Sequence, residues 1–289
     1  MITLTYTCSN GTVFNLLSWE GVKTEKSNYH KYKWSAEVQK ARFGDRIVNF
    51  TKASCFYEAT FLFRGTKEAR RQQIDAFHFC TEYDIAKQTP GRITWGSDYI
   101  ECYITESSTE PRDDGGVYTE NKVSIYCPYP FWIEEQTISI FPQDPPQPAL
   151  DTDKGYPQTK ISYPVPYSYS PGRNARLVNT HHYDSSNFRL VAYGATESLD
   201  VNIGGHRYNV NHEIGLREYM VIDSRQNVKA DKRCYLVNSQ GEEINIFNDR
   251  NPESSLFEKI PGGSFIVNYN RGYGIVLTLF KERSEPRIV

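Results

Sequence analysis

Residues 57–80, YEATFLFRGTKEARRQQIDAFHFC, decide the fold of the first half of this chain. Four hydrophobic residues alternate with other side chains at a period of two, which is typical of a strand with one buried face: Tyr57, Ala59, Phe61 and Phe63. Gly65 ends this run, and Thr66 can cap a helix that opens at Lys67. The stretch therefore predicts a strand followed by one short amphipathic helix over residues 66–81.

The predicted helix separates an inner face from a basic outer face. At helical spacing, one face collects Ala69, Gln73, Ala76, Phe77 and Cys80. Lys67, Arg70 and Arg71 point away from that face. Pro90-Gly91 then turns the chain into a further predicted strand.

Short alternating runs bounded by turn residues fill most of the remaining sequence. Asn10-Gly11 and Gly204-Gly205 each lie between two such runs, a strong signal for a tight hairpin. Strands recur every ~8–12 residues in the second half, as in a sandwich or jelly roll. We therefore predict a mainly β protein of two β-sandwich domains, the first with one short helix and a long hairpin arm.

The domain boundaries are predicted from proline content. The run from Phe141 to Pro148 is rich in proline and predicts an extended, semi-rigid chain. We expect an N-terminal domain over residues 1–140, a linker over 141–159 and a C-terminal domain over 160–289.

Two charged stretches of the first half are harder to interpret. Residues 20–45 have no clean period and are predicted to be loop and irregular strand, and β structure is predicted to resume from Ile47 to Phe50. Residues 106–121 are polar and rich in turn residues, and an alternating run follows them at once. They are predicted to form the tip of a long hairpin arm that grips a neighbouring subunit, and a loop without a partner is the alternative.

Charge and hydropathy argue against several classes of function. The formal net charge is −2, from 33 basic and 35 acidic residues, so the basic excess that binds a phosphate backbone is missing. No window approaches the ~20 apolar residues of a membrane helix, and the first residues do not resemble a signal peptide. The six cysteines have no metal-binding spacing, and we expect them to be reduced and buried. We expect neither sequence-specific nucleic-acid binding nor membrane insertion.

No constellation of residues predicts an active site. One candidate, His181-His182 with Asp184, lacks further ligands at useful spacing and is interpreted as a polar loop between the domains. Glu134-Glu135 and Asp113-Asp114 are paired only in sequence, with no sign of the burial that acid–base work requires. We expect no catalytic residue, no metal and no cofactor, and hence no enzyme.

Several motifs together resemble a known family. They are the Phe61–Arg71 run, Pro90-Gly91-Arg92, Cys102-Tyr103-Ile104, the Cys127–Trp132 segment and the Ile260–Gly263 turn. In order and spacing these look like distal tail proteins (Dit) of long-tailed, siphovirus-type phages. The resemblance implies a ring-forming N-terminal β-sandwich domain and a galectin-like C-terminal domain.

The resemblance also implies a function and a set of partners. It predicts a structural virion protein of the phage tail tip or baseplate, assembled in the bacterial cytoplasm. A homo-hexameric ring would join the tail-tube protein to the tail-associated lysin or fibre protein and dock receptor-binding or adhesin proteins. The alternative is an adhesion module whose galectin-like domain binds host cell-wall saccharide directly. The residues expected at the assembly interface are Lys67, Arg70, Arg71, Arg112, Asp113 and Asp114.

Overall fold

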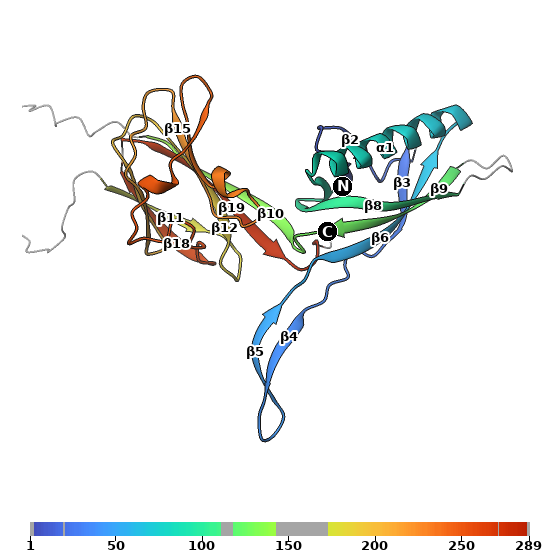
Figure 1. Cartoon of the computed structure of the whole chain (residues 1–289), viewed down its shortest axis with the longest axis horizontal. Coiled ribbons are helices and arrows are strands. Elements are labelled where there is room, and N and C mark those ends of the chain that lie inside the picture. Colours follow the sequence, from blue (N-terminus) through green and yellow to red (C-terminus); the bar gives the residue numbers. More distant parts are fainter. Residues whose placement is uncertain (1–2, 20, 111–117, 143–172, 271, 288–289) are drawn as a thin grey trace, which may run out of the picture. The chain divides into compact units, whose positions relative to one another are not determined.

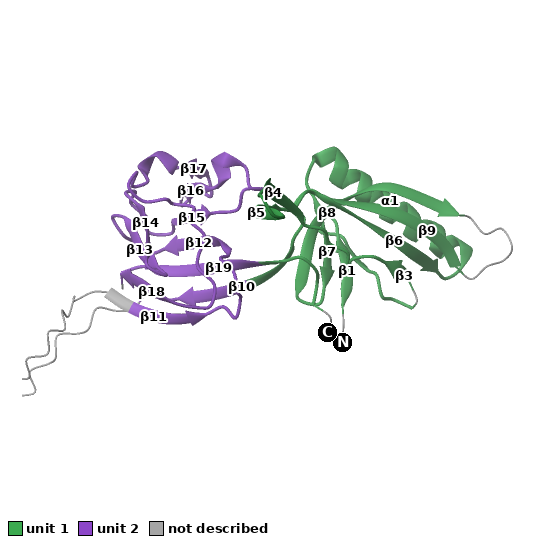
Figure 2. Cartoon of the chain, turned by 90° about the horizontal axis from the view of Figure 1, so that it is seen from below, with its two compact units in different colours: residues 1–135, 282–289 green, residues 136–281 purple. Residues whose placement is uncertain are grey.

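A computed structural model describes residues 3–19, 21–110, 118–142, 173–270 and 272–287. The chain forms two compact units (Figures 1 and 2): residues 1–135 with 282–289, and residues 136–281. The predicted linker over 141–159 lies almost wholly outside the described residues, so the boundaries at 140 and 160 stay predictions. The structure groups residues 282–289 with the first unit, whereas the sequence assigned them to the second domain.

The first unit contains two antiparallel sheets that share one long strand, β8. The first half of β8 pairs with β7, and the order continues to β1 and β2. The second half pairs with β9, followed by β6 and β3. The strands are β1 (Leu4–Thr7), β2 (Val13–Asn15), β3 (Val22–Ser27), β6 (Cys55–Arg64), β7 (Gly91–Trp95), β8 (Asp98–Glu110), β9 (Tyr118–Cys127) and β10 (Trp132–Ile140), which enters the second unit.

The strand that opens the decisive stretch has the predicted buried face. All four alternating hydrophobic residues of β6 are at most 4% exposed. Helix α1 (Lys67–Lys87) packs against β6 and β8, as Figure 1 shows. The Thr66 hydroxyl accepts a hydrogen bond from the Ala69 backbone amide, so the predicted cap is confirmed.

The helix is longer than the predicted 66–81, because no glycine or proline interrupts it before Pro90. It ends at Gln88, whose backbone is left-handed and satisfies the last carbonyl groups. The buried face is also displaced from the predicted one. Ala76 is exposed, and the additional last turn buries Asp84.

Asp84 ties the last turn of α1 to the first strand. Its carboxylate accepts hydrogen bonds from the Tyr6 hydroxyl (2.5 Å), the Cys8 thiol (3.1 Å) and the Ser9 backbone amide (2.8 Å). Burial and this carboxylate raise the pKa of Tyr6, and burial raises the pKa of Cys8 to about 12. A Cβ at Gly91 would lie 2.4 Å from Asp84 Oδ2, so the predicted Pro90-Gly91 turn needs glycine for a close approach.

The second unit is a sandwich of two antiparallel sheets. One sheet orders β17, β16, β15, β12 and β19, with β10 beyond β19, and the other orders β11, β18, β13 and β14. A single apolar core lies between them. The strands are β11 (Arg173–Asn179), β12 (Asn187–Tyr193), β13 (Leu199–Ile203), β14 (His206–Val210), β15 (Tyr219–Asp223), β16 (Cys234–Val237), β17 (Glu243–Asn245), β18 (Ser264–Asn270) and β19 (Gly274–Arg283), and two 3₁₀ helices are η1 (Ala230–Lys232) and η2 (Phe247–Asp249).

The mainly β fold and both hairpins predicted from sequence are confirmed. Asn10-Gly11 connects β1 to β2, and Gly204-Gly205 connects β13 to β14. All six cysteines are free thiols and five are buried, as expected. The exception is Cys55, which is only partly buried.

The C-terminal segment is bound within the first unit. The Arg287 guanidinium pairs with Glu134, and its backbone amide donates to the buried Asp98 carboxylate (2.8 Å). The Trp34 indole donates to the Ser284 hydroxyl (3.1 Å). These contacts explain why residues after β19 belong to the unit where the chain begins.

Candidate interaction surfaces

The three basic residues predicted to lie outside the helix lie at the beginning of α1. Lys67 and Arg71 are exposed, and Arg70 is half-buried. Arg71 pairs with Asp75 one turn later at 3.9 Å, a contact between exposed groups that contributes little to stability. The other three predicted interface residues, Arg112, Asp113 and Asp114, lie outside the described residues.

The strands on both sides of residues 111–117 pair as far out as Glu110 with Glu120. The hairpin predicted there is therefore present. However, β9 also pairs with β6 over its whole length, from Cys127 to Tyr118. β9 is therefore an interior strand with the second half of β8 at the sheet edge, and the described part of this hairpin is not a free arm.

A free arm occurs instead over residues 35–51, of which those up to 45 were predicted to be loop and irregular strand and Ile47 to Phe50 to be β structure. β4 (Ser35–Lys40) and β5 (Asp45–Thr51) form a separate two-stranded sheet that projects from the first unit (Figure 1). Every residue of both strands is exposed. The sequence concealed β4 because no buried face imposes a period on it, and the bulge that leaves Val48 unpaired between Ile47 and Asn49 breaks the alternation of β5.

One face of the arm is apolar up to the charged pair Lys40 and Asp45 near its tip, and the other face is polar. The register places Ala36 opposite Phe50 and Val38 opposite Ile47. These pairs share a face, and Val38, Ile47 and Phe50 are between 48% and 54% exposed. The opposite face carries Ser35, Glu37, Gln39, Arg46, Asn49 and Thr51. An isolated two-stranded hairpin is marginally stable in water, so an apolar face of this kind favours a partner that covers it.

The base of the arm is held by an aromatic cage around one lysine. Lys52 Nζ lies 4.4 Å from the ring centroid of Phe131, 5.7 Å from that of Trp34 and 5.9 Å from that of Tyr32. The same ammonium is buried without a hydrogen-bond partner among the described residues. Burial lowers the pKa of Lys52 to about 8, while the rings favour the charged form. The cage fixes both chain ends from which the arm leaves.

We expect Lys52 to make the stability of the first unit depend on pH. Between pH 8 and the ordinary lysine value of 10.5, the unfolded chain retains a proton that folded Lys52 has released. The free energy of unfolding should therefore rise with pH across this window. One released proton corresponds to about 1.4 kcal/mol per pH unit, and we expect only a fraction of this because the Lys52 side chain is partly exposed.

Urea unfolding of the wild type and of Lys52→Met, followed by tryptophan fluorescence from pH 7 to pH 10, measures this effect. All four tryptophans lie in the first unit, so the signal reports on that unit. As the pH rises, the free energy of unfolding of the wild type should increase relative to that of Lys52→Met. Lys33→Met, at an exposed lysine nearby, is the control; identical pH profiles for all three proteins would contradict the assignment.

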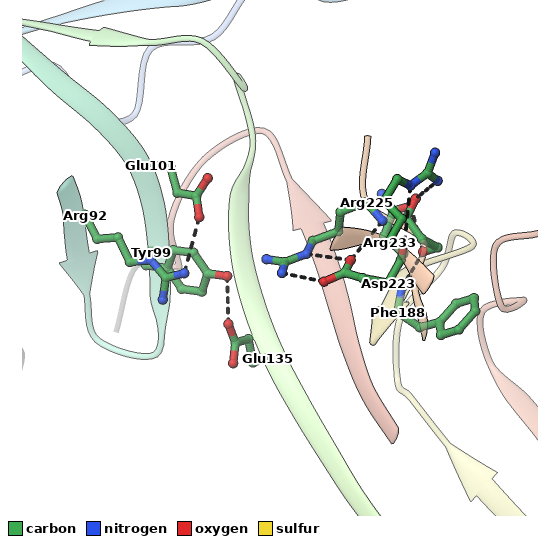
Figure 3. Close-up of polar contacts among 10 residues, drawn as sticks. Arg92, Tyr99, Glu101, Glu135, Phe188, Asp223, Arg225 and Arg233 are labelled. Carbon is green, nitrogen blue, oxygen red and sulfur yellow. Dashed lines mark hydrogen bonds and ion pairs between the residues drawn. The ribbon is translucent and has the colours of Figure 1, made fainter. Parts of the chain in front are cut away.

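Several other charged residues are engaged in local contacts within their own units. Figure 3 shows, in the first unit, Arg92 paired with Glu101 (3.3 Å) and the Tyr99 hydroxyl donating to Glu135 (2.7 Å). In the second unit, Arg225 makes a bidentate pair with Asp223 (2.7 and 3.0 Å). These contacts position strands and bring no acid–base pair together.

The histidine pair lies in a loop, as predicted, but inside the second unit and not between the domains. His181 and His182 occupy the connection between β11 and β12, one exposed and the other 8% exposed. Among the described residues there is no group of three His, Cys, Asp or Glu side chains that could hold a metal ion. No helix in the described part of the chain is long and apolar enough to cross a membrane.

Comparison with known proteins connects this architecture to phage tails. No protein-family model matches the chain, and no curated protein is significantly similar in sequence. Among solved structures, the SPP1 Dit (gp 19.1) protein, described as a paradigm of the hub adsorption apparatus in phages that infect Gram-positive bacteria, is similar with a TM-score of 0.60 at 11% identity. The match covers 98% of this chain and 99% of that one.

Two structures of the phage P2 baseplate in its activated conformation are similar to the same degree. The one with Ca has a TM-score of 0.63 at 11% identity, and the one with Sr has 0.62 at 10%. Each match covers 99% of this chain and 100% of that chain. The resemblance to the distal tail proteins predicted from sequence motifs is thus confirmed at the level of the fold.

Proposed function

We propose that this chain is a structural, non-enzymatic hub protein of a phage tail tip or baseplate, located in the virion and assembled in the bacterial cytoplasm. The observation that carries the proposal is the agreement of the whole fold, across both units, with the SPP1 Dit protein and phage P2 baseplate chains. Agreement over nearly the full length of both chains favours a shared architectural role over the reuse of one common domain.

In this proposal six copies close a ring through the first unit. A closed ring repeats one heterologous contact, so each copy must present two different complementary surfaces. The β4–β5 arm supports one of them, because its apolar face is exposed in the single chain. The basic beginning of α1, with Lys67, Arg70 and Arg71, remains the proposed second surface, together with Arg112, Asp113 and Asp114 at the β8–β9 tip.

The ring would join the tail-tube protein to the tail-associated lysin or fibre protein, and the second unit would dock receptor-binding or adhesin proteins. The genome would pass through the lumen of the ring without being bound. The low net charge of −2 supports this, because a cationic wall would retain DNA phosphates.

Native mass spectrometry of the purified full-length chain, combined with negative-stain imaging, tests the proposal. We expect a population of six copies that appears as an annulus, formed by the chain alone or after addition of its tail-tube protein. A strictly monomeric protein under both conditions would overturn the ring.

A further inference from the structure

Two cysteines of the first unit lie directly opposite each other on neighbouring strands. The register of β6 and β9, which run side by side in Figure 1, pairs Cys55 with Cys127. Directly opposed residues of an antiparallel pair have Cα atoms about 4.5–5.5 Å apart and side chains on the same face of the sheet. A disulfide needs a Cα separation of about 4.4–6.8 Å. The two strands therefore already hold these free thiols at a separation that a disulfide can span.

The two thiols differ in their access to solvent. Cys127 is fully buried in the core of the first unit, whereas Cys55 is only partly buried and packs against that core. Cys55 also lines a cavity of about 210 Å³ at the base of the β4–β5 arm, together with Tyr57 and Lys52. The other four cysteines are buried, and none of them is among the described residues that line this cavity. A reagent that enters the cavity therefore meets the sulfur of Cys55 first.

The surroundings of Cys55 favour its thiolate. Hydrogen bonds from the Cys127 thiol and the Tyr57 hydroxyl stabilise the negative charge, and the Lys52 ammonium attracts it. These contacts lower the pKa of Cys55 to about 7, against the opposing effect of burial. The hydrogen bond to Cys55 and burial raise the pKa of Cys127. Because the thiolate is the nucleophile in disulfide exchange, Cys55 reacts first and Cys127 supplies the second thiol.

The charged residues that line the cavity are cationic. Lys31, Lys33 and Lys52 line it, and no acidic side chain is among the described lining residues. Lys31 and Lys33 are exposed, so their charges face the solvent from which a reagent arrives. Such a cluster raises the local concentration of an anionic reagent and repels a cationic one within a Debye length of about 8 Å. The cavity therefore distinguishes small disulfides by their charge.

We propose that Cys55 and Cys127 form a redox-active dithiol, in which Cys55 is a modification site for anionic disulfides of low molecular weight. The Cys55 thiolate attacks one sulfur of the small disulfide and bonds to it, and the other sulfur leaves as a thiolate that takes a proton from water. Cys127 then attacks Cys55 Sγ, and its proton passes to the second departing thiolate as the cross-strand disulfide closes. The two protein thiols lose two electrons, which the small disulfide gains as it becomes two thiols.

The new bond would fix the base of the β4–β5 arm. β5 ends at Thr51 and β6 begins at Cys55, so the disulfide would join the chain to β9 just after the arm. Thiols stay reduced in the bacterial cytoplasm and oxidise outside the cell. In a tail-tip protein the bond would therefore form only after the virion leaves its host. This timing rests on the proposed function, whereas the chemistry of the dithiol does not.

The experiment treats the reduced full-length protein with oxidised glutathione, which is anionic, and follows the products by intact-mass spectrometry and peptide mapping. The wild type should lose two hydrogen atoms (about 2 Da) and contain one disulfide, between Cys55 and Cys127. In Cys127→Ser, glutathione should stay attached to Cys55, and in Cys55→Ser neither product should form. Cys234→Ser, which removes a buried thiol of the second unit, is the control and should react like the wild type.

A second measurement tests the selection by charge. The ratio of the reaction rates with oxidised glutathione and with cationic cystamine should fall about fivefold when Lys31→Glu and Lys33→Glu are combined. Lys229→Glu changes an exposed lysine of the second unit that does not line the cavity, and it should leave the ratio unchanged.

Four results would each overturn the proposal: no reaction of the wild type, glutathione that stays attached to its Cys55, a disulfide between other cysteines, or equal rate ratios in all the charge variants. Native mass spectrometry of the same reduced and oxidised samples reads ring formation separately. Failure of the dithiol and failure of the ring are therefore distinguishable.

Discussion

Replacing Ile47 and Phe50 by aspartate is expected to give a folded protein that does not form the proposed six-copy ring. Both side chains lie on the apolar face of the β4–β5 arm and are more than half exposed in the single chain. The substitution should therefore cost little in the monomer. In an assembled ring the two carboxylates would be buried against a neighbouring copy, and each would lose its hydration without gaining a partner.

The loss of assembly should be large because the two substitutions occur at every interface between copies in the proposed ring. A loss of about 1.4 kcal/mol weakens one contact tenfold, and an unpaired buried carboxylate costs more than that. We expect native mass spectrometry to detect six-copy species of the double variant at less than about a tenth of their wild-type fraction.

A matched control separates the apolar face from the added charge. Gln39→Glu with Asn49→Asp also adds two negative charges to the arm, on its polar face. This variant should form rings nearly as well as the wild type. Equal loss of assembly in both double variants would show that charge, and not the apolar face, governs the contact, and unchanged assembly in both would exclude the arm from the interface.

Phe77→Ala is expected to be the most destabilising single substitution considered for the first unit. Phe77 is fully buried where α1 meets both sheets. Its ring contacts four others at centroid distances of 5.5–5.8 Å: Tyr6, Phe14, Phe61 and Phe63. Removing it leaves a cavity that these rings can fill only by abandoning their mutual packing, at a cost of about 3–5 kcal/mol.

Urea unfolding followed by tryptophan fluorescence measures this loss in the first unit. Phe79→Ala is the control, because Phe79 lies on the same helix and is 63% exposed. Its effect should stay within about 0.5 kcal/mol. Similar midpoints for the two variants would mean that the helix is not anchored through Phe77.

Local sequence patterns were sufficient for elements that bury one regular face or close a tight turn. The alternation from Tyr57 to Phe63 determined β6, Thr66 determined where α1 begins, and the two glycine-containing turns determined two hairpins. Each of these signals acts within a few residues, so tertiary contacts were not needed to interpret it. The motifs with their spacing also pointed to the fold that the solved phage structures share.

The tertiary structure alone decided the features that depend on residues far apart in sequence. The position of the last turn of α1 depends on the hydrogen bond between Asp84 and Tyr6. The position of the C-terminal segment depends on the hydrogen bonds that Arg287 donates to Asp98 and Glu134. Strand β4 of the arm left no signal, since a strand without a buried face needs no hydrophobic alternation.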